Sequence, residues 1–286
     1  MTVLANQQRF RIFALLSPAY LWLTVAIFLP LSAMLYFSFL SDVPFGNKEW
    51  HFTTENYQAF FQTSTYAKLL WKSILLGLMV TSISVLIGFP CAYVLAKTIK
   101  GRSREALFLL VILPFWSNSL VRIFSWAIVL RGNGVLDLGL NAILPFEVDV
   151  NLMFTTYAVV IGLVHSYLPY VILTSYLALQ AIDDNLIDAA RAMGANKLTI
   201  LCRIILPLSL PGLIAGAVLI FVPVVGSFME PRILGGRMGT YYGTVIEDQF
   251  VAVFNWPLGA ALSFILLAVV LMILATASPI LKRAQT

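Results

Sequence analysis

The stretch DAARAMGANKLTILCRIILPLSLPG, residues 188–212, interrupts a chain that otherwise consists mostly of long apolar runs. Asp183 or Asp184, just before it, can cap a helix by accepting a hydrogen bond from a free backbone N–H. Gly194 is well placed for the left-handed position that ends such a helix. The pattern therefore predicts a short polar helix inserted between two membrane segments.

A second short helix is predicted directly after Gly194. Asn196 can cap it, and Pro207, which has no N–H to donate and fits a first helical turn, marks the turn into the next apolar run. Apolar residues recur at helical spacing in both predicted helices. They are Leu186, Ala190 and Met193 in the first, and Leu198, Leu201, Cys202 and Ile205 in the second.

The small residues Ala189 and Ala190 keep one surface of the first predicted helix shallow, so a partner's side chains could approach its backbone closely. The same pattern also fits a helix that rests on lipid headgroups with its cations toward the phosphates. Periodicity alone leaves a protein-docking helix and a lipid-surface helix both open.

Composition places the chain in a membrane. Of its 286 residues, 60% are hydrophobic and 11% are charged, whereas a soluble domain carries about 25% charged residues. The two cysteines, Cys91 and Cys202, and the two histidines, His51 and His165, are too few and too scattered to suggest a disulfide framework or a metal centre.

Six apolar runs are long enough to cross a bilayer, which needs about 20 residues of helix. They cover approximately residues 12–40, 73–96, 106–130, 152–179, 208–228 and 258–281. The first run is longer than the apolar core of a cleaved signal peptide and lacks a clear small-x-small cleavage site, so we interpret it as a retained anchor.

The charges between these runs predict the orientation of the chain. With both termini in the cytoplasm, eleven Lys and Arg residues lie on the inner side and six on the outer side, with Arg122 inside a span. This excess follows the positive-inside rule. The quoted stretch then lies in a cytoplasmic loop between the fourth and fifth spans.

The quoted stretch resembles the EAA motif of binding-protein-dependent ABC importer permeases. Seven positions match the pattern over twenty residues, with Asp188 standing where the motif ordinarily begins with Glu. The matching residues are Asp188, Ala189, Ala190, Gly194, Ile204, Leu206 and Pro207. In that family the loop forms a coupling helix that docks on the ATP-hydrolysing subunit, so the resemblance favours the docking interpretation.

Other segments resemble the spermidine/putrescine-type permeases of this family. They are residues 113–126 (LPFWSNSLVRIFSW), 203–216 (RIILPLSLPGLIAG), 233–236 (ILGG) and 255–261 (NWPLGAA). The resemblance implies an all-α integral membrane protein with six transmembrane helices and the type I ABC importer permease fold. It also implies an N-terminal helix and periplasmic loop over 1–68, a core domain over 69–277 with its coupling loop at 181–207, and a cytoplasmic tail over 278–286.

The same resemblance implies a set of partners in the bacterial inner membrane. We expect a second, homologous permease that forms a heterodimer with this chain, two cytoplasmic ATPase subunits, and a periplasmic or lipid-tethered solute-binding protein. The chain itself contains no G-x-x-x-x-G-K-[ST] phosphate loop, so ATP and Mg²⁺ would be used by the partner ATPase and no cofactor by this chain.

Two other classes of protein fit the sequence less well. An integral membrane enzyme would need a catalytic motif, and neither HExxH, GxSxG nor a plausible triad occurs. A channel or an ion-coupled secondary transporter would need no docking helix and would be expected to carry several acids inside its spans. Nearly all acids here lie outside the apolar runs.

Six residues are predicted to line the translocation pathway, namely Trp116, Asn118, Arg122, Trp126, Tyr170 and Glu230. A charge inside a span usually faces a cavity, but Arg122 could equally snorkel outward or brace a neighbouring helix. Glu230 could meet a substrate ammonium or pair with Arg232. The aromatic residues could offer cation–π faces or belong to the interfacial belts.

The cargo implied by the resemblance is a polyamine, spermidine or putrescine, moved by alternating access while ATP is hydrolysed. The alternatives are the same machine with another cargo, such as ferric iron, sulfate, a phosphonate or an opine. Much of the selectivity in such systems belongs to the binding protein, which is a separate chain.

Overall fold

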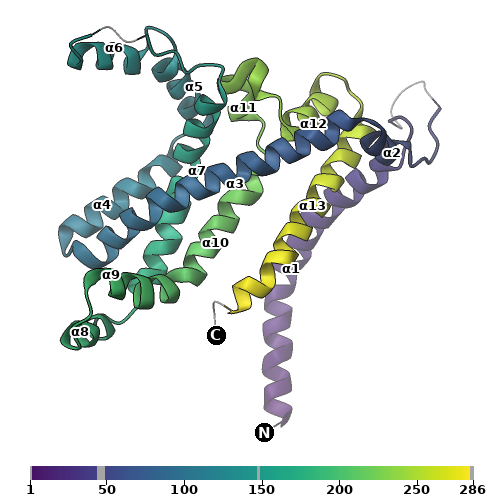
Figure 1. Cartoon of the computed structure of the whole chain (residues 1–286). Coiled ribbons are helices and arrows are strands. Elements are labelled where there is room, and N and C mark those ends of the chain that lie inside the picture. The colour runs from purple at the N-terminus through teal and green to yellow at the C-terminus, as the bar shows by residue number, and fades with distance from the viewer. Residues whose placement is uncertain (1, 44–48, 147–148, 284–286) are drawn as a thin grey trace. The chain divides into compact units, whose positions relative to one another are not determined.

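The computed structural model describes residues 2–43, 49–146 and 149–283, and the regular secondary structure in these ranges is helical apart from one isolated β-bridge between Leu40 and Phe52 (Figure 1). Five of its helices are long and apolar enough to cross a membrane, and a bent helix pair makes a sixth span if it is counted as one. The all-α membrane fold predicted from the sequence is confirmed.

The chain divides into two compact units, each of which is described by itself. The first contains α1 (Thr2–Ser38), α2 (Glu55–Gln62) and residues 246–265, which belong to α12 (Tyr242–Val251) and α13 (Trp256–Arg283). The second contains residues 64–245 and the remainder of α13. Its helices are α3 (Ser64–Tyr93), α4 (Arg102–Ile112), α5 (Ser119–Leu130), α6 (Val135–Ile143), α7 (Thr156–Gln180), α8 (Asp184–Ala192), α9 (Lys197–Ile200), α10 (Leu206–Val225) and α11 (Met229–Gly235).

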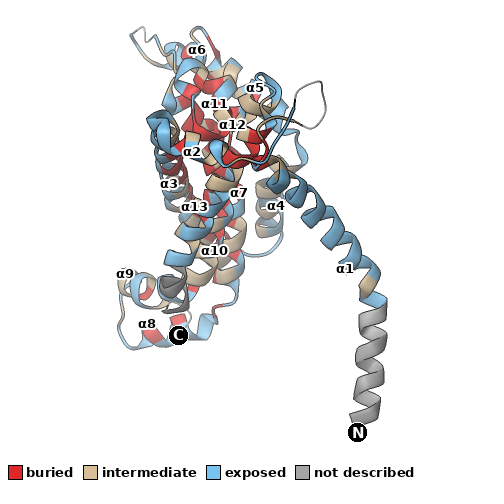
Figure 2. Ribbon diagram, turned by 90° about the vertical axis from the view of Figure 1, so that its right-hand side faces the viewer, coloured by how far each residue is buried: buried red, intermediate tan, exposed pale blue. Residues whose placement is uncertain are grey.

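Helices α3, α7 and α10 pack on one another to form the centre of the second unit. Figure 2 shows their buried residues in red along α7 and α10, with a further patch on α8. Two apolar clusters result. One joins α3, α5, α7, α10 and α11, and the other attaches α8 and α9 to the ends of α3 and α7. The short helices α8 and α9 lie at the opposite end of α7 and α10 from α11 (Figure 1).

Helices α7 and α10 approach each other closely at two glycines of α10. A Cβ atom added at Gly212 would lie 2.9 Å from the carbonyl oxygen of Thr174, and one added at Gly216 would lie 3.3 Å from the Cα atom of Val171. Both neighbours are backbone atoms that cannot rotate away. Glycine at these positions therefore sets the spacing of the two helices.

The third predicted span, residues 106–130, is not one straight helix. Residues Arg102–Trp116 and Ser119–Leu130 are bent by 98° at a short break. Pro114 lies in the 3₁₀ turn before the break and has no N–H for a helical bond. The Asn118 side chain accepts a 2.8 Å hydrogen bond from the Leu120 N–H and so starts a new helix.

The turn predicted at Pro207 is absent, because the helix that begins at Lys197 continues into α10. A π-helical turn, η3 (Leu201–Ile205), joins the two, and the Leu206 N–H bonds to the Leu201 carbonyl five residues back. The wide turn accommodates Pro207, whose ring would clash with the carbonyl four residues earlier in a regular α-helix. A second π-turn, η1 (Val94–Thr98), ends α3.

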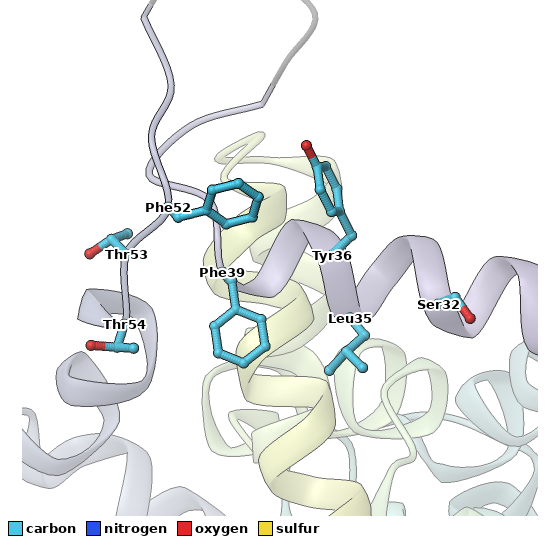
Figure 3. A pocket seen from close by; sticks show the side chains of 7 residues that line it. All are labelled: Ser32, Leu35, Tyr36, Phe39, Phe52, Thr53 and Thr54. Carbon is cyan, nitrogen blue, oxygen red and sulfur yellow. The ribbon is translucent and has the colours of Figure 1, made fainter.

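The first unit contains an aromatic pocket of about 750 Å³ where the end of α1 meets the segment around the β-bridge. Figure 3 shows the side chains of Tyr36, Phe39 and Phe52 at this pocket. The rings of Tyr36 and Phe52 meet edge to face, with centroids 5.6 Å apart. This edge-to-face contact holds the segment at Phe52 against the end of α1.

Candidate coupling helix and translocation site

Helix α8 is the predicted coupling helix, and local chemistry fixes both of its ends. At its start the Asp183 carboxylate accepts a 2.9 Å hydrogen bond from the Asn185 N–H. At its end the Ala195 N–H bonds to the Ala190 carbonyl (3.0 Å) and the Gly194 N–H to the Arg191 carbonyl (2.9 Å). Gly194 has φ +82°, the left-handed geometry of a Schellman cap. Of the two residues predicted as the first cap, Asp183 is the cap and Asp184 begins α8, and the predicted cap at Gly194 is confirmed.

The predicted cap at Asn196 is confirmed as well. Its side-chain oxygen accepts a 2.8 Å hydrogen bond from the Thr199 N–H at the start of α9. Between the two caps the chain reverses its direction within a few residues (Figure 1). The paired caps hold α8 as a separate helix beside the end of the long helices.

The apolar stripe predicted on α8 is divided between two faces. Ala190 is buried, 3% exposed, beside Ile187, and both belong to the cluster that attaches α8 to the spans. Leu186 and Met193 are exposed, Met193 by 82%. The prediction of one stripe was wrong, because the short Ala190 side chain is buried against the spans whereas the Leu186 and Met193 side chains are exposed. Leu186, Ala189 and Met193 thus form an exposed, shallow, apolar face, which we call the outer face of α8.

Asp188 is exposed and forms an ion pair of 2.9 Å with Arg191, one turn further along α8. Both side chains are largely in solvent, so the pair contributes little to stability. Asp188 therefore remains accessible to another cation. The last three predicted coupling residues lie beyond α8, with Ile204 half-buried in η3 and Leu206 and Pro207 exposed at the start of α10.

The predicted pathway residues are only partly brought together. A pocket of about 410 Å³ beside the bend of the third span contains Arg122 and Trp126. It also contains His165 of α7, whose ring meets the Trp126 ring edge to face at 5.4 Å. Ser117 and Ser125 line it too, although sequence analysis did not select them as site residues. Their spacing around Arg122 on the same segment is the signal that could have found them.

Arg122 braces the bend of its own span. Its Nη1 donates a 3.0 Å hydrogen bond to the Pro114 carbonyl, which also accepts hydrogen bonds from the N–H and the hydroxyl of Ser117 at the break. Its buried Nε has no partner among the described residues, and the same holds for Nδ1 of His165. The guanidinium is thus a structural brace that still has a free donor beside the pocket.

The other predicted pathway residues do not line this pocket. Trp116 is 89% exposed, and Asn118 is occupied as the cap of α5. The Tyr170 ring packs on Phe115, with centroids 4.7 Å apart. Glu230 is buried at the start of α11, where its Oε2 accepts a 2.9 Å hydrogen bond from the Ser227 hydroxyl. No group of three potential metal ligands occurs among the residues that the structure describes.

Comparison with known proteins gives the context of this arrangement. Residues 84–284 match the family model of the binding-protein-dependent transport system inner membrane component. The chain is 36% identical to a protein of Haemophilus influenzae named spermidine/putrescine transport system permease protein PotB, over 92% of each chain. It is 35% identical to the protein of the same name from Escherichia coli K12, over 92% of this chain and 96% of that one.

Solved structures agree on the fold. A bacterial ABC transporter that imports the acidic polysaccharide alginate has a chain similar to this one, with a TM-score of 0.75, 17% identity and coverage of 99% of both chains. A chain of the MetNI methionine ABC transporter has a TM-score of 0.59 over 76% of this chain and 95% of that one. With a capped α8 between its fourth and fifth spans and a family match over most of its length, the chain belongs to the binding-protein-dependent transport system inner membrane components.

Proposed function

We propose that this chain is a permease subunit of an ATP-driven importer and that its cargo is a polyamine, spermidine or putrescine. The assignment of the cargo rests on the identity of 35–36% with two permeases named for spermidine and putrescine, over more than nine-tenths of every chain compared. The family membership and the fold support the transporter class independently of the cargo.

The outer face of α8 supports the assignment of the energy source. It offers exposed apolar and small side chains beside an accessible carboxylate, Asp188, on a helix held at both ends. A surface of this kind fits a groove on another protein better than it fits water. In the proposed complex, two ATPase subunits bind ATP and Mg²⁺, and their closure moves α8 and its counterpart in a second, homologous permease.

The chain carries out no bond chemistry in this scheme. A periplasmic or lipid-tethered binding protein delivers the solute on the outer side, and the paired permeases change between inward-open and outward-open states. The scheme requires α8 and both chain termini to be cytoplasmic, in agreement with the distribution of Lys and Arg. The transporter would lie in the bacterial inner membrane.

An anionic cargo such as sulfate or a phosphonate is the second candidate, because one observation favours it. Arg122 places a cation with a free donor beside the 410 Å³ pocket, and such a group attracts an anion and repels an ammonium. Because Arg122 also braces the bend through Pro114, its charge has a structural explanation, and the polyamine is the better supported cargo.

The test is uptake by the complete transporter in a strain that lacks other polyamine importers. Labelled putrescine, spermidine, sulfate and a phosphonate are each supplied, with deletion of this chain as the control. We expect saturable uptake of a polyamine that is lost on deletion. Saturable uptake of only an anion would replace the polyamine by the second candidate, and uptake that continues without the ATPase would contradict the transporter class.

A further inference from the structure

Lys97 lies where three elements of the second unit meet. It belongs to η1, the π-turn that ends α3, and its Nζ donates a 2.7 Å hydrogen bond to the carbonyl of Ile182, two residues beyond α7. The same Nζ forms a 2.6 Å ion pair with Oδ1 of Asp184, the first residue of α8. One ammonium group therefore contacts the end of α7 and the start of α8 from the end of α3.

The environment makes these contacts strong. The Lys97 side chain is only 8% exposed, whereas that of Asp184 is 73% exposed. Ile182 and Ile187 are buried in the cluster that holds α8 against the spans. A buried ammonium that lost its partners would be costly, because little water could replace them. Both contacts are short and charge-assisted, which is the stronger class of hydrogen bond.

The π-turn gives Lys97 its position. In η1 the Ile99 N–H bonds to the Val94 carbonyl, five residues back. Such wide turns occur mostly as single insertions in α-helices and are frequent at functional sites. The turn also ends α3, so Lys97 lies on the last turn of a membrane-spanning helix and beside α8.

We propose that Lys97 is a positioning residue that ties α8 to α3 and α7, so that a movement of α8 is passed into both membrane helices. The inference rests on the proposed function, because it assumes that a partner moves α8. Without the ammonium, α8 would remain attached through the apolar contacts of Ile187 and Ala190, which can slide. The polar clamp has discrete partners and cannot slide without breaking.

The opposite end of α3 is attached in a similar way. Nζ of Lys72 donates to the carbonyls of Met238 (2.9 Å) and Thr240 (3.0 Å), and it lies 4.2 Å from the centroid of the Tyr241 ring. Helix α3 is thus held by two lysines, Lys97 just past its end beside α8 and Lys72 about two turns after its start beside the segment that follows α11. A displacement at Lys97 would reach that far segment through a single helix.

Lys100 is the matched control for Lys97. It is a lysine three residues later and lines the same 170 Å³ polar pocket behind α8. It is exposed, and the structure gives it no hydrogen bond or ion pair with a described residue. A change that acts only through the local positive charge would affect both lysines, whereas the proposed clamp depends on Lys97 alone.

The first experiment measures coupling in the complete transporter reconstituted into liposomes. Uptake of labelled spermidine and hydrolysis of ATP are recorded in the same preparation for the wild type, Lys97→Met, Asp184→Asn and Lys100→Met. We expect Lys97→Met to lower the number of solutes moved per ATP by about five- to tenfold, the scale of a modest coupling energy between sites. Lys100→Met should match the wild type.

Asp184→Asn tests the same clamp with a milder change, because the Ile182 contact remains. We expect its ratio of solute to ATP to lie between those of the wild type and Lys97→Met. The double variant Lys97→Met with Asp184→Asn should be no worse than Lys97→Met alone, since the two residues share one interaction. If the Lys97→Met transporter does not assemble, Asp184→Asn still tests the proposal. A wild-type ratio of solute to ATP in Asp184→Asn would overturn it.

A second measurement does not depend on the cargo. Spin labels are placed on the native Cys91 of α3 and on α8 through Ala192→Cys, in a Cys202→Ser background, since all three positions are exposed and Ala192 is not part of the outer face of α8. When nucleotide is trapped in the complex, the distance between the labels should stay narrow in the wild type and broaden in Lys97→Met. Equal distributions would overturn the clamp, even if polyamine uptake failed and the cargo had to be revised.

Discussion

At the scale of single residues, Gly194 decides where α8 ends. Its φ of +82° is favourable for glycine, and a Cβ there would meet no other atom within 4 Å. A substitution is therefore opposed by backbone strain of about 1 kcal/mol and, in the proposed complex, by its effect on the docked ATPase. It is not opposed by a steric clash inside the chain.

Gly194→Asp should leave the chain in the membrane but abolish retention of the ATPase and uptake, because it adds a side chain and a negative charge to the docking side. Gly194→Asn is the control, since Asn has nearly the same shape, tolerates left-handed backbone and carries no charge. Retention of the ATPase on the purified permease and uptake in cells are the measurements. Normal uptake by Gly194→Asp would contradict the assignment of α8 as the coupling helix.

The Lys97–Asp184 pair also predicts a pH dependence. The hydrogen bond from Lys97 holds the pKa of the Asp184 carboxyl below its ordinary value of 3.8. A depressed pKa gives stability that is present above the unfolded value and lost as pH falls through the folded one. The transport rate of the wild type divided by that of Asp184→Asn should therefore be constant from about pH 5 to pH 8. A change of that ratio within this range would show that another group titrates there.

Residue-level features differ in how far the sequence predicts them. The caps at Asp183, Gly194 and Asn196 are local, because donor and acceptor lie within a few residues. The sequence predicts Gly194 and Asn196 directly and Asp183 as one of two candidates. Lys97 was counted only as a cytoplasmic charge. Its partner Asp184 lies 87 residues further along the chain, and no local pattern indicates a contact over that separation.

At the scale of elements, the contact between α7 and α10 is the most constrained. Gly212 faces the backbone oxygen of Thr174, and the helices could admit a methyl group only by moving apart. Overpacking of this kind costs roughly 1–3 kcal/mol. The helix spacing is therefore a property of glycine placement.

Gly212→Ala should lower the thermal stability of the purified chain, while Gly139→Ala should not. Gly139 also lies within a helix, α6, but a Cβ added there would meet nothing within 4 Å, and alanine is the better helix former. Thermal unfolding in detergent, followed by loss of monodisperse protein, compares the two variants. Equal stability of both would show that α7 and α10 are not in close contact in the native chain.

Helix boundaries were predictable where an apolar run gives way to polar residues. They were unpredictable where a helix bends inside an apolar run. All six apolar runs correspond to helices, yet the run over 106–130 is bent by 98°. Proline alone does not indicate such a break, because Pro90, Pro169 and Pro211 lie inside continuous helices. At residues 114–118 proline coincides with the cap Asn118, and the combination interrupts the helix.

At the scale of the whole molecule, sequence patterns were sufficient to predict the class and the family. Length and spacing of the apolar runs gave the spans, and the motif at 188–207 gave the family, which the match over residues 84–284 confirms. The candidate translocation site was less predictable. Its residues come from several helices, and only Arg122 and Trp126 of the six predicted residues line one pocket.

The arrangement of polar groups explains this difference. A docking motif is contiguous, so its residues are neighbours in the sequence and in space. The pocket at Arg122 is assembled from different helices, so patterns along the sequence show only parts of it. Arg122 lines the pocket beside the bend, whereas Glu230 is buried at the start of α11 and bonded to Ser227.

The outer face of α8 has a consequence for the lifetime of the chain in the cell. Before assembly, Leu186 and Met193, together with Leu198 of α9, are exposed to water. Exposed apolar side chains of this kind are what chaperones and proteases of the quality-control system bind. If the proposed ATPase covers this face, permease made in excess over it should be degraded, and the supply of one subunit would set the abundance of the other.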